Sequence, residues 1–400
     1  MKPFLIGVFC FLILCGTLGA QDSDQNVILE YDLEIEGEYR FFLEEGQFEQ
    51  QLQHFPSFAL KPAFSLSWKN GYENLNFLGF VRLDRDEQRT HWDIRELYYQ
   101  KARNNWELNV GLKKIFWGVT ESNHLVDIIN QTDQVESFDG EAKLGQPLLS
   151  FDWTSDQLGT FSFFYLPYHR KRVFPGPKGR LRFSEIINGD QLGYEANAAE
   201  WLPSFALRWS HYWGIADIGF SQFYGNGREP LLNFNTEGSI EAFYPTISQS
   251  GLDLQLTHNA FLWKLEAIYR YADVQDFFAF TGGLEYTFSN VNKKGLDLGL
   301  LSEYLYDSRD ELSLTATQND LFIGMRLAFN DINDQAFLIG TTLDLSYGTN
   351  SIFVEASRRV GDSFTLSLEA VLYPYISEKE LILGAFRNDS FLKLAISKFL

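Results

Sequence analysis

Residues 116–146 contain the first group of side chains in this sequence that could do chemistry. A connection this long either enters the interior of the fold or covers an opening. Inside a pore, its charged side chains would form a constriction that sets pore size and selectivity, as rings of charge do in channels. A loop whose polar residues simply face water is the alternative. The residues of the predicted constriction are Glu121, Asn123, His124, Asp127, Asn130 and Asp133.

Three of these side chains, His124, Asp127 and Asp133, would also suit a metal ion, because hard cations are bound by carboxylates. Their spacing is generic, however, and it does not match a specific metal-binding motif. We therefore predict no metal site and no cofactor.

A basic stretch forms the second group, and it inverts the local charge of an otherwise acidic chain. One interpretation is contact with anions inside a pore. Another is contact with the phosphorylated lipid of an outer leaflet, because arginine binds phosphate in a bidentate way. The third is a solvated loop, and the sequence leaves all three open. The members of the stretch are Arg170, Lys171, Arg172, Lys178, Arg180 and Arg182.

The third group is an acidic stripe within residues 29–41, where apolar and charged residues alternate. Alternation with a period of two predicts a strand with one apolar and one charged face. A charged side chain that faces lipid is costly, so the carboxylates should face a lumen. There they would attract cations, or they would pair with Lys61, Arg82 and Arg208 and hold the structure together. The stripe consists of Glu30, Asp32, Glu34, Glu36 and Glu38.

The same alternation recurs along the chain and predicts the fold that positions these groups. Aromatic residues make up 16% of the chain, yet no apolar run after residue 20 is long enough for a membrane helix. Short turns near 69–74, 102–105, 155–159 and 213–216 alternate with longer connections near 44–57, 116–146, 169–200 and 226–246. This asymmetry is typical of transmembrane barrels. We predict an all-β, antiparallel up-and-down β-barrel of 16–18 strands. A count of the alternating segments reaches 19, but bacterial single-chain barrels have even strand numbers, so eighteen is preferred.

The N-terminal residues have the layout of a secretory signal peptide over 1–20, with cleavage after Ala20. We expect a short periplasmic N-terminus over 21–27 and the barrel over 28–400, without a plug domain before it. Both cysteines, Cys10 and Cys15, lie in the signal, so the mature chain can form no disulfide. The formal net charge of −20 argues against nucleic acid as a partner.

A short motif gives the chain a family resemblance. Within residues 111–133 the pattern Trp-Gly-x-x-Glu-Ser, followed by Asn-x-x-Asp, resembles the signature of a poorly characterised porin-like family of Gram-negative outer-membrane β-barrel proteins. Gln131 stands where that family commonly has proline. The hairpin from Glu355 to Asp362 is similar to one in the last third of the family. The resemblance implies a barrel and pore-like transport, but no particular substrate. The matching residues are Trp117, Gly118, Glu121, Ser122, Asn130 and Asp133.

Together these features predict a bacterial outer-membrane, porin-like channel for passive passage of small polar or charged solutes. The alternative is a scaffold barrel with a plugged lumen, a subunit of a larger outer-membrane complex. An enzyme is disfavoured, because the sequence has no local catalytic motif such as Gly-x-Ser-x-Gly. The expected partners are outer-membrane lipid, the barrel assembly machinery during biogenesis, small solutes and other envelope proteins.

Overall fold

The computed structural model describes residues 27–187, 192–234, 240–310, 317–380 and 382–400. The described chain forms one closed antiparallel barrel of 18 strands, which confirms the predicted fold class and the preferred strand number. The predicted signal peptide over 1–20 lies outside the described residues.

Eighteen strands build the barrel wall, and three short strands form a separate small sheet in the connections. The barrel strands are β1 (Ile28–Phe42), β2 (His54–Trp68), β3 (Glu73–Leu83), β4 (His91–Arg103), β5 (Trp106–Lys113), β6 (Gln146–Ser155), β7 (Gly159–Leu166), β9 (Ser204–Trp213), β10 (Ala216–Asn226), β13 (Thr246–His258), β14 (Phe261–Ala272), β15 (Phe277–Phe288), β16 (Asp297–Asp307), β17 (Asn319–Ala328), β18 (Ala336–Asp344), β19 (Asn350–Val360), β20 (Phe364–Tyr375) and β21 (Phe391–Phe399). The small sheet contains β8 (Gly193–Tyr194), β11 (Leu231–Phe234) and β12 (Ile240–Tyr244), and the 3-10 helices are η3 (Ala199–Trp201) and η5 (Leu383–Phe386).

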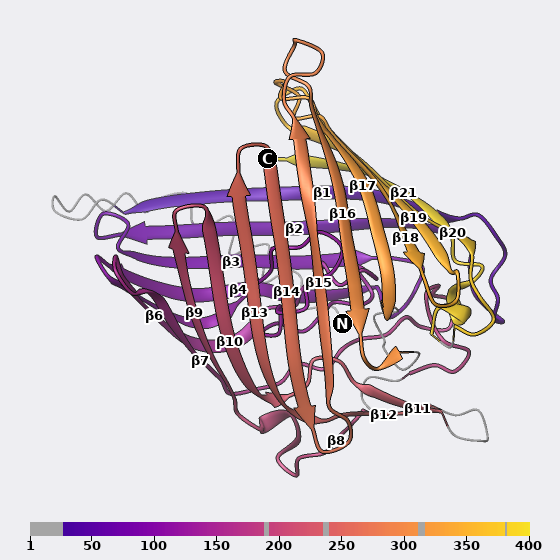
Figure 1. Cartoon of the computed structure of the whole chain (residues 1–400), viewed down its shortest axis with the longest axis horizontal. Coiled ribbons are helices and arrows are strands. Elements are labelled where there is room, and N and C mark those ends of the chain that lie inside the picture. Colours follow the sequence, from indigo (N-terminus) through magenta and orange to yellow (C-terminus); the bar gives the residue numbers. More distant parts are fainter. Residues whose placement is uncertain (1–26, 188–191, 235–239, 311–316, 381) are drawn as a thin grey trace, which may run out of the picture.

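The wall closes because the last strand pairs with the first. Each barrel strand is antiparallel to the next along the chain, and β21 pairs with β1 from Glu34↔Phe399 to Phe42↔Phe391. Closure gives β1 a partner on both sides from Leu33 to Phe42, and its first residues, 28–32, extend beyond β21. Pairing on both sides satisfies backbone groups as a bilayer interior requires. In Figure 1 strands β13–β16 run steeply while β1–β4 cross the view, the appearance expected for tilted barrel strands.

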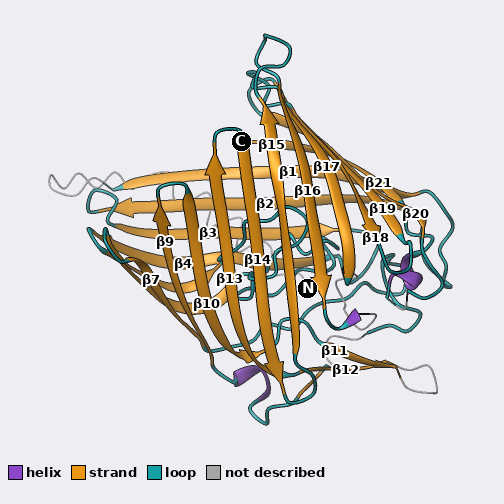
Figure 2. Cartoon of the chain, in the orientation of Figure 1, coloured by secondary structure: helices purple, strands orange, loops and turns teal. Residues whose placement is uncertain are grey.

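The two ends of the barrel differ as the sequence predicts. One end has tight turns such as 69–72, 104–105 and 214–215, and β1 starts and β21 ends there. The other end has the long connections 114–145 and 167–203. We call these the short-turn end and the long-loop end. Figure 2 shows how little of the chain outside the strands is helical. No helix in the described ranges is long and apolar enough to cross a membrane.

The two faces of the wall have opposite chemistry. Large apolar side chains such as Tyr31, Trp92 and Tyr212 are exposed on the outer face, where lipid would cover them. Inside, most of the buried residues are charged or polar, and they are held by ion pairs and hydrogen bonds. There are two exceptions. A small cluster of Leu301, Leu305 and Phe322 lies on the inner face of β16 and β17, and a larger apolar patch lies on the inner face of β6–β15. It consists of Leu148, Phe164, Leu166, Ala206, Phe223, Ile247, Ile268, Ala272, Phe277 and Ala279.

Candidate functional site

Residues 114–145, which connect β5 to β6, lie inside the barrel. Their side chains reach Arg82 on β3 and Arg95 on β4, and also Arg326 on β17. Their backbone meets Glu266 on β14 and Glu303 on β16. Only a segment within the closed sheet can contact strands on such separate parts of the wall. Figure 2 shows this connection as loop between the front and back strands.

Two buried wall carboxylates hold the first half of this inner loop. Glu266 accepts the backbone N–H groups of three loop residues at 2.7–3.1 Å and the hydroxyl of Thr120 at 2.8 Å. Glu303 accepts two further N–H groups, at 2.9 and 2.8 Å, and the hydroxyl of Ser122 at 2.5 Å. Loop N–H groups that point outward in this way form a concave site for an anion. The donated N–H groups belong to Val119, Thr120, Val126, Glu121 and Ser122.

The apolar patch supplies the other part of the loop's binding surface. Trp117, Val126, Ile128 and Ile129 of the loop are buried in one cluster with the inner face of β6–β15. Trp117 meets Phe164 edge-on, with ring centroids 5.5 Å apart. Burial of these side chains fixes the loop against one side of the lumen, because apolar surface leaves water when they pack. The opposite side of the lumen has only the small apolar cluster around Phe322 and is otherwise open to polar groups.

That opposite side carries a row of charged side chains at one level of the wall. Strand register aligns Arg326, Leu338, Glu355, Glu369, Lys393 and Arg40 as successive partners from β17 to β1. We call the five charged members of this row the charged belt. Glu355 is exposed, and the side chain of Arg326 is 37% exposed although it lies inside the barrel. The belt therefore borders water.

One pair in the charged belt is electrostatically unfavourable. Glu355 and Glu369 stand directly opposite each other on adjacent strands, an arrangement that like charges destabilise. Glu369 forms an ion pair with Lys393 on its other side. Within the described residues no ion pair of Glu355 is present, so one carboxylate of the belt stays uncompensated at close range.

The loop edge that faces the charged belt is acidic. At one end, Glu121 pairs with Arg326 at 2.5 Å. At the other end, Arg40 donates to the backbone carbonyl of Glu136 at 3.5 Å. Asp139 and Glu141 follow in the second half of the loop. We call the gap between this acidic edge and the charged belt the eyelet.

Asp139 of the loop lies within electrostatic range of Glu369 on the wall. Its surface is open to the lumen, but the surrounding protein raises the pKa of its carboxyl, and repulsion from Glu369 and Glu141 adds to that rise. Asp139 on the loop is therefore close enough to feel Glu369 on β20. The middle of the eyelet has carboxylates on both sides.

His124 fastens the loop to the wall beside the eyelet. Its Nε2 lies 3.1 Å from Glu141, and its Nδ1 lies 3.8 Å from Glu266. Burial disfavours the charged ring, but the hydrogen bonds and negative charges of the two carboxylates outweigh that effect and raise the pKa of His124 to about 10. At neutral pH the ring is an imidazolium that bridges loop and wall.

The structure divides the predicted constriction residues into two groups. Glu121 and His124 lie at the eyelet. The backbone carbonyl of Asn123 lies 2.5 Å from the Thr120 hydroxyl oxygen and shares its one proton with Glu266. The other three are buried and engaged in holding the loop's own shape. Asp127 pairs with Lys143, Asn130 donates to the carbonyls of Lys113 and Leu144, and Asp133 pairs with Arg95.

The alternative of a metal ion at His124, Asp127 and Asp133 finds no support in this geometry. Each of the three side chains turns to a different partner. Within the described residues, no three acidic or histidine side chains are arranged to hold a metal ion.

Sequence reasoning missed Asp139 and Glu141 on the loop, and Glu355 and Glu369 on the wall. The wall residues carried a usable signal, because Glu369 alternates with the apolar residues of its strand and so belongs to the lumen face. The loop residues carried none, since their role depends on which side of the lumen the loop occupies.

The acidic stripe on β1 is largely neutralised. Lys61 pairs with Glu34 at 3.0 Å and with Glu36 at 2.7 Å. Arg82 and Arg89 pair with Glu38 at 3.4 and 2.7 Å, so the end of the stripe nearest the long loops is a buried ion-pair network. Glu30 and Asp32 remain exposed near the short-turn end. Arg208, a third expected partner, pairs with Asp253 instead.

The basic stretch lies in residues 167–187, which cross the long-loop end from β7 toward β1–β4. Arg170 pairs with Asp93, and Lys178 with Glu87. Arg180 pairs with Asp389 at 2.7 Å, and both side chains are 1% exposed.

The other members of the stretch also make internal contacts. Arg172 donates to Gln131 and Gln134, Arg182 donates to backbone carbonyls, and Lys171 lies over the Tyr194 ring. Arg180 and Arg182 are buried. Their guanidinium groups bind Asp389 and backbone carbonyls of neighbouring loops, which contradicts a lipid-phosphate contact or a solvated loop at these two positions. Within the part of the chain that the structure describes, no member of the stretch pairs with the acidic stripe, whose carboxylates are matched by Lys61, Arg82 and Arg89.

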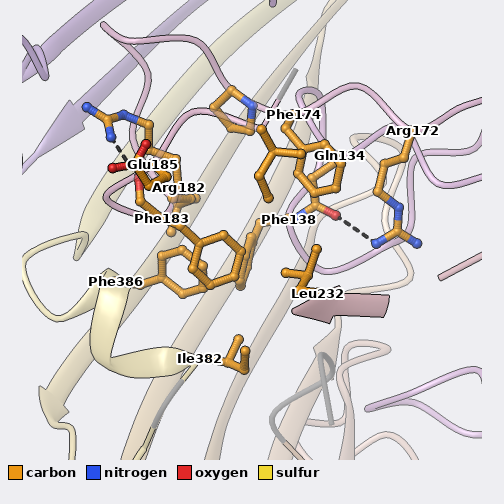
Figure 3. Close-up of a pocket in the computed structure, with 13 residues that line it drawn as sticks. Gln134, Phe138, Arg172, Phe174, Arg182, Phe183, Glu185, Leu232, Ile382 and Phe386 are labelled. Carbon is orange, nitrogen blue, oxygen red and sulfur yellow. Dashed lines mark hydrogen bonds between the residues drawn. The ribbon is translucent and has the colours of Figure 1, made fainter. Parts of the chain in front are cut away.

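A small pocket marks the place where the loops meet above the eyelet. Figure 3 shows Phe138, Phe174, Phe183 and Phe386 turned toward one another, with Arg172 and Gln134 hydrogen-bonded at one side. The pocket has a volume of ≈ 50 Å³, which is room for a few water molecules. Its aromatic lining indicates that the mouth loops form a small core of their own.

Comparison with known proteins places the fold. The sequence matches no protein-family model and no curated protein. Solved barrels resemble it at low identity. Wzi of Escherichia coli, an outer-membrane protein involved in group 1 capsule assembly and a carbohydrate-binding β-barrel, has a TM-score of 0.53 and 12% identity, over 91% of this chain and 83% of its own.

Two Pseudomonas structures are similar to a comparable degree. Pseudomonas aeruginosa OccK8 (OprE) has a TM-score of 0.53 and 10% identity, over 93% of this chain and 98% of its own. A BenF-like porin from Pseudomonas fluorescens Pf-5 has a TM-score of 0.54 and 11% identity, over 94% and 98%. At such identities the likeness shows the fold alone, a closed antiparallel β-barrel.

Proposed function

We propose that this protein is a porin-like channel of the bacterial outer membrane for passive passage of small polar or charged solutes. The observation that carries the proposal is the charged belt, which stays water-exposed opposite a loop that is anchored to the other side of the lumen. The similarity to a solved BenF-like porin supports it.

The eyelet would be the narrowest part of the path and would set selectivity. In its middle, Glu355, Glu369, Asp139 and Glu141 face two cations, Lys393 and His124. Four carboxylates against two cations leave a formal charge of −2. A negative, water-filled gap between low-dielectric walls concentrates cations. We therefore propose a modest cation preference that weakens as salt rises, because screening shortens the range of the field.

The basis of this preference differs from the one that the sequence suggested. Glu36 and Glu38 are buried in ion pairs with Lys61, Arg82 and Arg89. Their replacement by glutamine would unmask cations inside the wall and loosen the structure. Selectivity is assigned instead to the exposed carboxylates of the eyelet.

Export and assembly form part of the same proposal. Residues 1–20 would be removed as a signal peptide, residues 21–27 would form a short periplasmic N-terminus, and the barrel assembly machinery would insert residues 28–400. N-terminal sequencing of protein extracted from outer membranes tests the cleavage site. Gln21 as the first residue is the expected result, and a chain that still carries Met1 would contradict it.

A scaffold barrel with a plugged lumen is the second candidate. The observation that favours it is the pair of long connections at one end, with 114–145 inside the lumen and 167–187 across its mouth. Wzi, a barrel of similar fold, is involved in capsule assembly. Such a barrel would bind other envelope proteins through its loops and would pass no solute.

Liposome swelling separates the two candidates. Purified protein is reconstituted into liposomes, which are diluted into isosmotic solutions of small sugars and amino acids. A channel lets the solute enter and the liposomes swell, with larger solutes entering more slowly. Liposomes that respond like protein-free ones to every solute would contradict the channel and favour the scaffold.

A further inference from the structure

The outer face of the barrel has a groove that the lumen chemistry does not explain. The groove has a volume of ≈ 1000 Å³, and its exposed lining is mostly apolar. It crosses the wall from β17 to β1, on the side where β1 and the steep strands β16–β18 diverge in Figure 1. Side chains on this face meet lipid when the barrel spans a membrane.

Strand register explains why the wall is hollow here. One row of outward-facing partners reads Phe337, Ala356, Leu368, Leu394 and Tyr39. The next row reads Arg358, Leu366, Ile396 and Gly37. Small residues, Ala356 in the first row and Gly37 in the second, interrupt large ones, so the large side chains form the rims and the small ones the floor.

A cation stands at one end of this apolar groove. Arg358 is exposed on the outer face, two residues before β19 ends at Val360. Within the described residues it has no carboxylate partner. Lys398, also on the outer face, lies beyond Ile396, with its ammonium group 5.5 Å from the Phe364 ring centroid. Charged groups on a lipid-facing surface are costly unless they reach polar headgroups.

Depth in the wall gives the groove a direction. The Arg358 end lies close to the short turn at 361–363, whereas Gly37 lies nine positions after the first residue of β1. The groove therefore runs from the short-turn end toward the middle of the wall. In outer-membrane barrels the short turns face the periplasm, so its charged end lies at the headgroup level of the periplasmic leaflet.

We propose that this groove is a specific site for one glycerophospholipid of the periplasmic leaflet. An acyl chain lies over Gly37 and Ala356, and the phosphate binds Arg358 with help from Lys398. Arginine suits this contact, because its planar guanidinium binds phosphate oxygens in a bidentate way. The site goes beyond the proposed channel function. It requires only that the barrel spans a membrane.

Charge complementarity selects a lipid over a second copy of the chain. A neighbouring barrel would cover Arg358 with apolar surface, and a buried charge without a partner is strongly destabilising. A phospholipid supplies both an anion for the cationic end and a hydrocarbon for the apolar floor. Lipopolysaccharide places its phosphates at the opposite leaflet, away from the short-turn end.

Native mass spectrometry of the purified full-length barrel in mild detergent, with added phosphatidylglycerol, tests the site. We expect one lipid retained per barrel. Arg358→Ala should weaken retention by about fivefold, the change that corresponds to ~1 kcal/mol per basic residue at a membrane surface. Ala356→Leu should weaken it independently by filling the floor. Arg359→Ala is the matched control, since the neighbouring residue has the same charge and points to the lumen.

Three results would overturn the site. These are equal lipid retention by the Arg358→Ala and Arg359→Ala variants, lipopolysaccharide in place of phospholipid, or a dimer mass in place of a lipid adduct. Heat-modified migration on SDS gels confirms that each variant is folded, and Ala356→Leu keeps the test decisive if the arginine variant does not fold. Liposome swelling is unaffected by loss of this site. A silent barrel that retains lipid would therefore contradict the channel alone.

Discussion

Release of the inner loop from Glu266 is the most informative perturbation of the proposed channel. Glu266→Ala removes the acceptor of three backbone N–H groups and one hydroxyl. A hydrogen bond contributes roughly 0.5–1.5 kcal/mol net, and more when the acceptor is charged. Four bonds at the middle of that range give about 4 kcal/mol. The substitution also removes the contact with the His124 imidazolium.

This free energy determines how much of the protein has the loop segment detached from the wall. About 4 kcal/mol corresponds to a change of roughly three orders of magnitude in an equilibrium constant, at 1.4 kcal/mol per tenfold. Glu303 and the apolar patch still hold the loop. The expected result is therefore local release of residues 119–126 rather than loss of the whole loop from the lumen. The detached state should become populated enough to observe.

Single-channel recording in planar bilayers measures this release. The Glu266→Ala barrel should show larger and noisier current steps than the unsubstituted protein. Glu107→Ala is the matched control, because Glu107 is a wall carboxylate on β5 whose one ion pair within the described residues is with Lys113. Identical current records from the two variants would refute the view that Glu266 anchors the constriction.

Three further outcomes follow from the same geometry. Because the pKa of His124 is raised from 6.5 to about 10, its stabilisation is complete below pH 6.5 and is lost as pH rises toward 10. Current noise should rise at pH 10 in the native channel, and a His124→Asn variant with the same pH response would contradict the clamp. Glu355→Gln should move the reversal potential in a salt gradient toward anions, and no shift would remove Glu355 from the path. Asp389→Ala leaves the Arg180 charge buried and should destabilise the folded barrel by ~3–5 kcal/mol, measured by thermal unfolding, whereas Glu87→Ala at the exposed loop pair should change little.

The alternation of apolar and polar residues predicted the strands of the barrel wall because this alternation has a physical cause. Successive side chains of a strand point to opposite faces, so Glu34 faces the lumen and Ile35 faces lipid once the sheet closes. The turn pattern could also be predicted, because antiparallel neighbouring strands are joined by tight turns at one end of the barrel. These features are local, and the structure confirms the strand number and the position of the main turns and loops.

The candidate site was less accessible to sequence because its contacts are distant in the chain. Thr120 and Glu266 are 146 positions apart, and Arg180 and Asp389 are 209 apart. The polar composition of residues 116–146 indicated a functional loop. It could not distinguish Asp133, which forms an ion pair with Arg95, from Asp139, which faces the charged belt. That distinction depends on the apolar patch, which decides the side of the lumen on which the loop lies.

In the proposed channel, the eyelet at Glu355 lies on a water-filled path through the barrel. Both cysteines of the chain fall within residues 1–20, so a single cysteine introduced by Glu355→Cys would be the only thiol of the processed protein. Addition of a cationic methanethiosulfonate during single-channel recording should lower the current irreversibly and reduce cation preference. Ala356→Cys, one residue along and facing lipid, should not respond. A Glu355→Cys barrel that carries current but is unchanged by the reagent, or a native barrel that carries no current, would contradict a water-filled path through the eyelet.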